Sequence, residues 1–363
     1  MSEHGIDRRA FLRGGGAAAG VAALALTSCV PRSDQTATRT KSSGPLVVRD
    51  IGGTYGAANR KAVYDPFTRE TGIQIKVVNI LHERMIAQIE EGRPRFDVMD
   101  INMTHLALFK QQGLSEELDY DRLKNARNAG IAESLLTSHG VGKNYWASVL
   151  AYRADAFDGK RPESWADFWS TGQFPGKRAL QGSLDWPELE FALLADGVPL
   201  DKLYPLDVDR AFAVLDDIKG SVPTFWESGA VPGELLDRKE VVASSVWNGR
   251  VQNLVKDGSP LAYAWNGARR QSNGYGIPKG ATNPEAAHRL IDFALRPEVQ
   301  AHFARIHPEG PVVPAAYAHL SETAAAHLAS SPGHLRSGFD LDVEWWVENG
   351  DALTKRWQAW ART

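Results

Sequence analysis

The chain has 363 residues with 41 basic and 44 acidic side chains, so its formal net charge is only −3. Such a balance lacks the basic face that nucleic-acid binding needs, and we expect no nucleic-acid partner. Its 43% hydrophobic content is typical of a globular protein, and the length is enough for two lobes with separate cores.

Residues 1–28 have the features of an export signal. Arg8 and Arg9 precede a weakly apolar Gly/Ala stretch that is too short to span a bilayer stably, as in twin-arginine signals. Asp7 stands where such signals usually carry Ser or Thr.

The sequence Leu-Thr-Ser-Cys at residues 26–29 resembles a bacterial lipoprotein cleavage box. We therefore expect a diacylglycerol on Cys29, the only cysteine, and a flexible polar tether over residues 29–45. This lipid would hold the protein at a membrane, in the periplasm or at the cell surface. It also leaves no cysteine for a disulfide, a metal site or a nucleophile.

Short apolar runs alternate with helical patterns after the tether. Strands are predicted at 46–50, 73–78 and 96–100, with a helical stretch ending at Gly72 and a helix over about 83–91. This β-α-β-α-β order implies a parallel sheet with helices on both faces.

A second region of the same kind follows. Its predicted strands are at 240–247 and 261–265, and helices are expected to begin at Ser164 and, after residues 178–180, at Asp185. Farther on, Asn283 with Pro284 predicts one helix start and Arg296-Pro297 predicts another.

Several short segments, in this order along the chain, resemble motifs of one family: 67–73, 96–98 with 111–114, 162–169, 246–249, and 277–281 through 297–300. They are similar to the extracellular solute-binding proteins of bacterial ABC importers, in the group of the spermidine/putrescine receptors. Together they cover nearly the whole chain beyond the signal.

The resemblance implies an α/β, two-lobed periplasmic-binding-protein fold of type II, each lobe a mostly parallel sheet flanked by helices. Lobe 1 would take residues 46–148 and 279–363, and lobe 2 residues 149–278. The chain would cross between them near 148–152 and near 275–278. Ligand would bind in the interlobe cleft, and hinge closure would bury it.

The family's ligand contacts map onto positions of this chain at the ends of predicted strands. The expected site consists of Gly53, Thr54, Tyr55, Asn102, Met103, Thr104, Trp146, Asp185, Glu188, Trp247 and Asn273. Structural roles stay open for several of them. The glycine turn can simply need a positive φ, and the two tryptophans can be packing residues.

Asp185 and Glu188 match the carboxylate pair with which polyamine receptors hold an ammonium. The same Asp-x-x-Glu spacing is also that of a helix capping box, which we favour, although Asp185 can serve both roles.

Asn273 marks a departure from the polyamine receptors, which carry an aspartate at that position. An uncharged amide cannot give the charge-assisted bond that a buried second ammonium needs. Arg269 and Arg270 lie just upstream, either facing the cleft or solvated at the surface. A polyamine-like amine is the family default, and an anionic or oxygen-rich molecule is the alternative.

An exported enzyme is the second hypothesis, and the sequence disfavours it. Neither a G-x-S-x-G nor an H-E-x-x-H motif is present, and His302 and His307 are not spaced as a metal pair. No cofactor and no catalysis are expected. We predict a monomeric receptor that delivers a small organic solute to an ABC permease with its ATPase, although a receptor feeding a sensor would have the same sequence features.

Overall fold

The computed structural model describes residues 44–182 and 186–362, which belong to one compact unit beginning at Ser42. The predicted signal, the lipidation site Cys29 and Asp185 lie outside the described residues. Within the described ranges, no helix is both long enough and apolar enough to cross a membrane.

The first part of the chain forms the predicted parallel sheet, because its strands carry buried apolar residues such as Leu46 and Val48. β1 (Leu46–Arg49) lies between β2 (Ile75–Val78) and β3 (Val98–Asn102), and both pairs are parallel. The connecting helices are α1 (Gly53–Asn59), a π-helical turn (Arg60–Tyr64), α2 (Asp65–Thr71) and α3 (His82–Glu90), and β3 leads into α4 (Met103–Gln111). The helical stretch ends, as predicted, at Gly72 with a φ of 75°.

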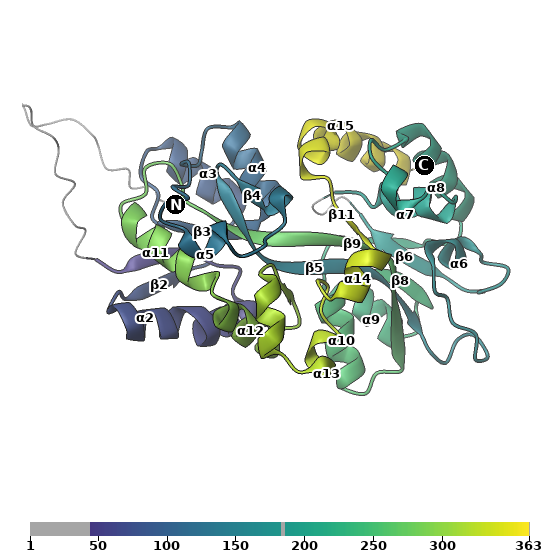
Figure 1. Cartoon of the computed structure of the whole chain (residues 1–363). Helices are drawn as coiled ribbons and strands as arrows, with labels where there is room; N and C mark the ends of the chain where they lie inside the picture. Colours follow the sequence, from purple (N-terminus) through teal and green to yellow (C-terminus); the bar gives the residue numbers. More distant parts are fainter. Residues whose placement is uncertain (1–43, 183–185, 363) are drawn as a thin grey trace, which may run out of the picture. The chain divides into compact units, whose positions relative to one another are not determined.

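Two long antiparallel strands run through the middle of the sheet and join its halves (Figure 1). They are β5 (Gly140–Arg153) and β9 (Leu261–Gly276), in the strand order β2-β1-β3-β9-β5-β8-β6-β7. We expected a strand at 261–265 only. Gly267, with a φ of 70°, bends the strand instead of ending it, and Trp165 donates its indole N–H to the Gly267 carbonyl over 2.9 Å.

The other half of the sheet contains β6 (Arg178–Gln181), β7 (Thr224–Trp226) and β8 (Ala243–Trp247). Its helices are α6 (Trp165–Trp169), α7 (Leu189–Ala195), α8 (Val208–Lys219), α9 (Val231–Asp237) and α10 (Asn248–Lys256). The predicted helix start at Ser164 is confirmed, since Ser164 and Asp167 form a reciprocal capping box.

The C-terminal third is mainly helical. Its main helices are α11 (Pro284–Ala294), α12 (Pro297–Ile306), α13 (Glu322–Ala325), α14 (Pro332–Ser337) and α15 (Val343–Ala361), and the proline-led starts of α11 and α12 are as predicted. Two short strands, β10 (Gly310–Pro311) and β11 (Phe339–Asp340), lie between these helices. Two further short elements, α5 (Lys124–Arg127) and β4 (Leu136–Thr137), precede β5.

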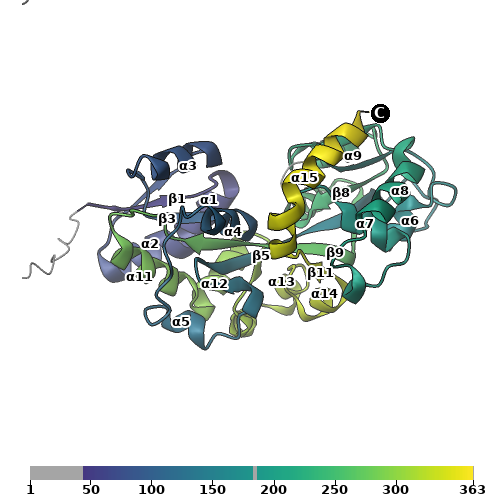
Figure 2. The same ribbon diagram turned by 90° about the horizontal axis from the view of Figure 1, so that it is seen from above.

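Two hydrophobic clusters form the core, and the second of them, which contains the buried residues of α6, α7 and α8, also includes part of the C-terminus. Residues 279–363 were all expected in lobe 1, yet Phe339, Trp346 and Trp357 belong to the second cluster. α15 packs against α4 as well, so it lies across the two halves (Figure 2). Gly276 pairs with Met99, so the end of β9 already lies beside β3 of the first half. The chain therefore crosses between the halves earlier than the expected crossing at 275–278.

Candidate functional site

Five side chains from three neighbouring strands lie on one face of the sheet near its middle. Ser148 on β5 is the register partner of both Trp247 on β8 and Arg269 on β9, and Trp146 is the partner of Gln271. Directly paired residues point to the same face, and so do residues two apart on one strand. The register therefore gathers residues that are up to 125 positions apart in the sequence.

Trp146 and Trp247 form aromatic walls on this face, and Trp226, at the end of β7, contacts the ring of Trp247. The ring centroids of Trp146 and Trp247 are 5.4 Å apart, and those of Trp226 and Trp247 are 5.9 Å apart, both in edge-to-face geometry. The Trp247 ring lies on Gly229, where any side chain would overlap it. Trp146 and Trp247 were predicted site residues, whereas Trp226 was not.

Several polar atoms of this group are buried without a hydrogen-bond partner among the described residues. They are the indole Nε1 atoms of Trp226 and Trp247, the amide Nε2 of Gln271 and the hydroxyl of Ser148. Leaving a buried donor unpaired costs about 1–3 kcal/mol, so donors of this kind usually meet an acceptor. Three of the four can only donate, which suits a ligand oxygen. We call these four residues together with Trp146 the tryptophan site.

Asn102 connects the first half of the sheet to the tryptophan site. Its side-chain oxygen caps α4 by accepting from the backbone N–H of Thr104 over 2.9 Å, and its Nδ2 donates to Oε1 of Gln271 over 3.2 Å. Met103 and Thr104 are buried, and Met103 packs in the first hydrophobic cluster. Among these three predicted residues, Asn102 is the one that contacts the tryptophan site.

The turn after β1 has the geometry that its glycines require. Gly52 and Gly53 have φ values of 80° and 60°, a backbone conformation that favours glycine over residues with a side chain. The side chain of Thr54 is exposed. Tyr55 instead points inward. Its hydroxyl donates to Oδ1 of Asp100 over 2.8 Å and accepts from the Lys143 ammonium over 2.8 Å.

The Tyr55 hydroxyl therefore belongs to a buried polar network rather than to an open surface. Lys143 also donates to Oδ2 of Asp100 over 2.5 Å and to Oδ1 of Asn59 over 2.6 Å. Burial raises the pKa of Asp100, although the Lys143 charge opposes the shift. Asn273 joins this network through a 3.4 Å contact from its Nδ2 to the Tyr55 hydroxyl.

Glu188 lies in a second buried network, and the capping-box interpretation is wrong for this residue. α7 begins after it, and no side chain among the described residues caps the helix. One Glu188 oxygen instead accepts from the backbone N–H of Gln181 over 3.0 Å, and the other lies 3.7 Å from the Arg269 guanidinium. Burial raises the pKa of Glu188 despite the Arg269 charge.

Arg269 and Arg270 are both buried and paired, so neither is the solvated surface charge that we considered. Arg269 contacts Glu190 at 3.2 Å as well as Glu188, and Arg270 contacts Asp340 at 2.8 Å. The indole of Trp346 donates to Glu190 over 2.8 Å, which connects the network to α15. Two buried carboxylates thus share one guanidinium beside the tryptophan site.

An open sheet of this topology, with polar and aromatic residues gathered where two long strands join its halves, is that of a type II periplasmic binding protein. The model of the bacterial extracellular solute-binding protein family matches residues 62–330, and the chain belongs to this family. It is therefore the solute-binding receptor of an ABC importer, not an enzyme, and it acts in the periplasmic or extracellular space.

Three relatives illustrate the similarity. The gamma-aminobutyric acid-binding protein of Pseudomonas aeruginosa is 35% identical over 326 residues, which are 88% of this chain and 91% of that one. The structure of an ABC transporter substrate-binding protein from Bradyrhizobium japonicum has a TM-score of 0.82 at 36% identity and covers 87% of this chain and 99% of its own. A solved GABA receptor has a TM-score of 0.79 at 31% identity and covers 88% and 98%.

Proposed function

We propose that this receptor binds a short amino acid whose ammonium and carboxylate lie at opposite ends, with γ-aminobutyrate as the reference ligand. The observation that carries the proposal is the set of unpartnered donors in the tryptophan site. Indole and amide N–H groups suit a carboxylate, and the Trp146 and Trp247 rings suit the methylene chain. The names of two relatives at 31–35% identity support the same ligand class.

A diammonium ligand fits this donor set poorly. An ammonium has only donors, so it cannot satisfy the N–H groups of Trp226, Trp247 or Gln271. Asn273, at the position of the aspartate in polyamine receptors, is uncharged and contacts Tyr55. For these reasons we propose the amino acid in place of the polyamine default.

The single ammonium of an amino acid would be held from the second half of the fold. Glu188 and Glu190 share the Arg269 guanidinium, so two acidic side chains meet one basic side chain there. Asp185, three residues before Glu188, is our candidate for direct contact with the ammonium. Gly53, Thr54 and Asn102 would face the ligand from the first half when the two lobes close around it.

A thermal-shift comparison of three four-carbon compounds tests the proposal. The chain from Ser42 contains both hydrophobic clusters and is the sample of choice. γ-Aminobutyrate at about 100 times its Kd should stabilise it by about 2.7 kcal/mol, a rise of several degrees in Tm. Putrescine lacks the carboxylate and butyrate lacks the amine, so both should give little or no shift.

Two variants with a matched control locate the site. Gln271→Leu and Trp247→Ala should each weaken γ-aminobutyrate binding at least tenfold. Trp265→Ala removes a partly buried tryptophan from the same sheet but outside the tryptophan site, and should leave the Kd unchanged. A shift with putrescine alone would restore the polyamine hypothesis, and a normal Kd in both variants would place the ligand elsewhere.

We also propose that the mature protein is a monomer and that it is anchored through Cys29, the anchor being inferred from the lipoprotein box alone. Mass spectrometry of the membrane fraction should find a diacylglycerol on Cys29. A Cys29→Ser variant should move to the soluble fraction while keeping its γ-aminobutyrate affinity. An unmodified cysteine in the native protein would contradict the anchor but not the ligand assignment.

A further inference from the structure

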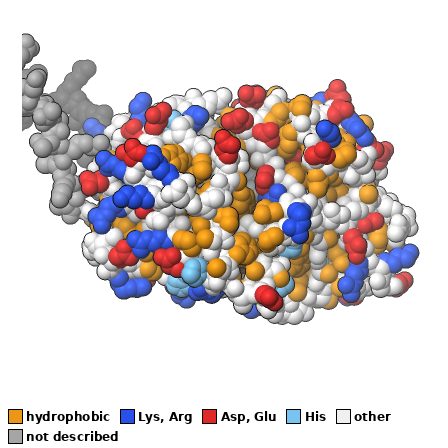
Figure 3. All heavy atoms as spheres, in the orientation of Figure 1, with side chains coloured by type: hydrophobic (Ala, Val, Ile, Leu, Met, Phe, Trp, Pro, Cys, Tyr) orange, Lys and Arg blue, Asp and Glu red, His pale blue; other side chains and the backbone are white. Residues whose placement is uncertain are grey.

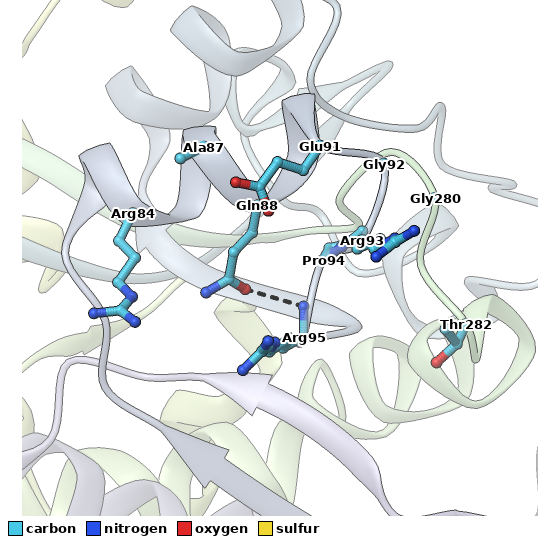
Figure 4. Close-up of a pocket in the computed structure, with 10 residues that line it drawn as sticks. All are labelled: Arg84, Ala87, Gln88, Glu91, Gly92, Arg93, Pro94, Arg95, Gly280 and Thr282. Atoms are coloured by element: carbon cyan, nitrogen blue, oxygen red, sulfur yellow. Dashed lines mark hydrogen bonds between the residues drawn. The ribbon is translucent and has the colours of Figure 1, made fainter. Parts of the chain in front are cut away.

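The arginine groove, a 570 Å³ depression on the first half of the fold, lies apart from the tryptophan site. It is lined by Arg84 on α3, by Arg93 and Arg95 in the loop before β3, and by Gly280 and Thr282 of another loop (Figure 4). Gln88 accepts from the backbone N–H of Arg95 over 3.1 Å and fixes this loop against α3.

The three arginines are exposed, and their charges are uncompensated locally. None of them has an ion-pair partner among residues 44–182 and 186–362. Glu91 is the single acidic residue of the lining, so the groove carries a net charge of about +2. An arginine that is not paired within the protein is available to oxygen-rich anions, which its guanidinium binds through two parallel hydrogen bonds.

The guanidinium groups do not converge on one point. Figure 4 shows that of Arg84 to the left of the Gln88 amide and that of Arg95 below it, whereas Arg93 points toward the side of Gly280 and Thr282. Separate anionic groups side by side suit such an arrangement, and the head groups of a bilayer are an array of this kind.

The groove also adjoins the point where the tether joins the fold. Asp97, two residues after Arg95, exchanges hydrogen bonds with Val47 at the start of β1, at 2.7 Å and 3.0 Å. Cys29 lies 17 positions before Leu46. Even a fully extended chain of this length reaches at most about 60 Å, so a lipid on Cys29 would keep this edge within that distance of the membrane.

We propose that the arginine groove binds the head groups of anionic phospholipids in the membrane that anchors the receptor. The proposal rests on the lipid anchor proposed above, and it goes beyond solute binding. Arg95 precedes β3 and Asn102 ends it, so the groove and the tryptophan site lie toward opposite ends of that strand. A receptor resting on its arginines would hold its ligand site away from the membrane, accessible to free solute.

Vesicle co-sedimentation of the chain from Ser42 tests the proposal, because this chain lacks the lipid. It should bind phosphatidylcholine vesicles containing about 30% phosphatidylglycerol and not phosphatidylcholine alone, and the binding should weaken at high salt. Replacing Arg84, Arg93 and Arg95 with Gln should weaken binding on the order of 100-fold, since each basic residue near an anionic surface contributes about fivefold.

A matched triple variant provides the control. Arg161, Arg250 and Arg336 are exposed arginines away from the groove, and replacing them with Gln changes the net charge equally. Its vesicle affinity should stay within about threefold of the parent. Equal losses in both triples would mean unspecific charge attraction and would overturn the proposal.

Inorganic phosphate distinguishes a lipid surface from a small-anion site. Stabilisation by millimolar phosphate that disappears in the groove variant, with no vesicle binding, would make the groove a phosphate site and contradict the proposal. The γ-aminobutyrate shift is measured on every variant. The shift should persist in every variant. A result against the groove proposal therefore appears in vesicle binding, whereas a result against the ligand assignment appears in the thermal shift.

Discussion

Asn102 and Gln271, 169 residues apart in the chain, are joined by a 3.2 Å hydrogen bond from the asparagine Nδ2 to the glutamine Oε1. The bond holds the first turn of α4 against β9, and the Gln271 Nε2, a donor of the tryptophan site, is left without a partner among the described residues. Asn102 is therefore a positioning residue for Gln271 as well as a helix cap.

Replacing Asn102 separates these two roles. Asn102→Asp keeps an oxygen to cap α4 but loses the donor to Gln271, so stability should change little while the γ-aminobutyrate Kd rises about tenfold. Asn102→Ala loses both and should also unfold about 1 kcal/mol more easily. Urea unfolding and calorimetric titration measure the two effects. Equal affinities for wild type and Asn102→Asp would contradict the positioning role.

The buried network of Tyr55, Lys143 and Asp100 predicts that two single variants lose different amounts of stability. Tyr55→Phe removes one hydroxyl and should cost about 1–3 kcal/mol. Lys143→Met leaves the fully buried Asp100 without its cation and should cost about 3–5 kcal/mol. Adding Asp100→Asn to Lys143→Met should recover part of that loss, and urea unfolding measures all three. A double variant with the full sum of both losses would mean that the two charges are not coupled.

The stacked imidazoles of His82 and His105 predict sensitivity to acid. Their ring centroids are 3.9 Å apart, and burial, followed by the His105 and Arg49 charges, lowers the pKa of His82 from 6.5 to about 3. As the pH falls from 6.5 toward 3, His82 binds a proton in the unfolded chain but stays neutral in the folded protein. The folded state therefore loses up to about 1.4 kcal/mol per pH unit from this residue.

The corresponding experiment compares urea unfolding at pH 7 and pH 5. His82→Gln should lose less stability than the wild type over this interval. His319→Gln, at an exposed position, should behave like the wild type. If all three proteins lose the same free energy, His82 is not held neutral by the fold.

Gly350 predicts an exception to helix propensity. Alanine normally stabilises the middle of a helix by about 1 kcal/mol over glycine. At Gly350 in α15, however, a Cβ would overlap the buried ring of Trp186, the residue next to the proposed ligand contact Asp185 in the sequence. Gly350→Ala should therefore lower the Tm and weaken ligand binding, whereas Gly333→Ala in α14, where a Cβ meets nothing within 4 Å, should be neutral or stabilising. A more stable Gly350→Ala protein would show that Trp186 moves freely.

The sequence by itself determined the class of protein and the local structure. Short apolar runs predicted β1, β2, β3 and β8, and the cap at Ser164 and the prolines at the first positions of α11 and α12 predicted helix starts, because these signals act within a few residues. Ordered motifs predicted the family. The same local rules ended one strand too early at Trp265 and assigned Glu188 to a helix cap.

Only the tertiary structure decided which side chains meet. Arg269 and Gln271 lie on the strand that continues through Gly267, and their alternation became informative only once β9 was paired with β5. Tyr55 is buried against Lys143, and Glu188 is buried against Arg269, both of them partners far away in the sequence. Sheet register and long-range charge pairing depend on the whole fold, and no window of neighbouring residues contains them.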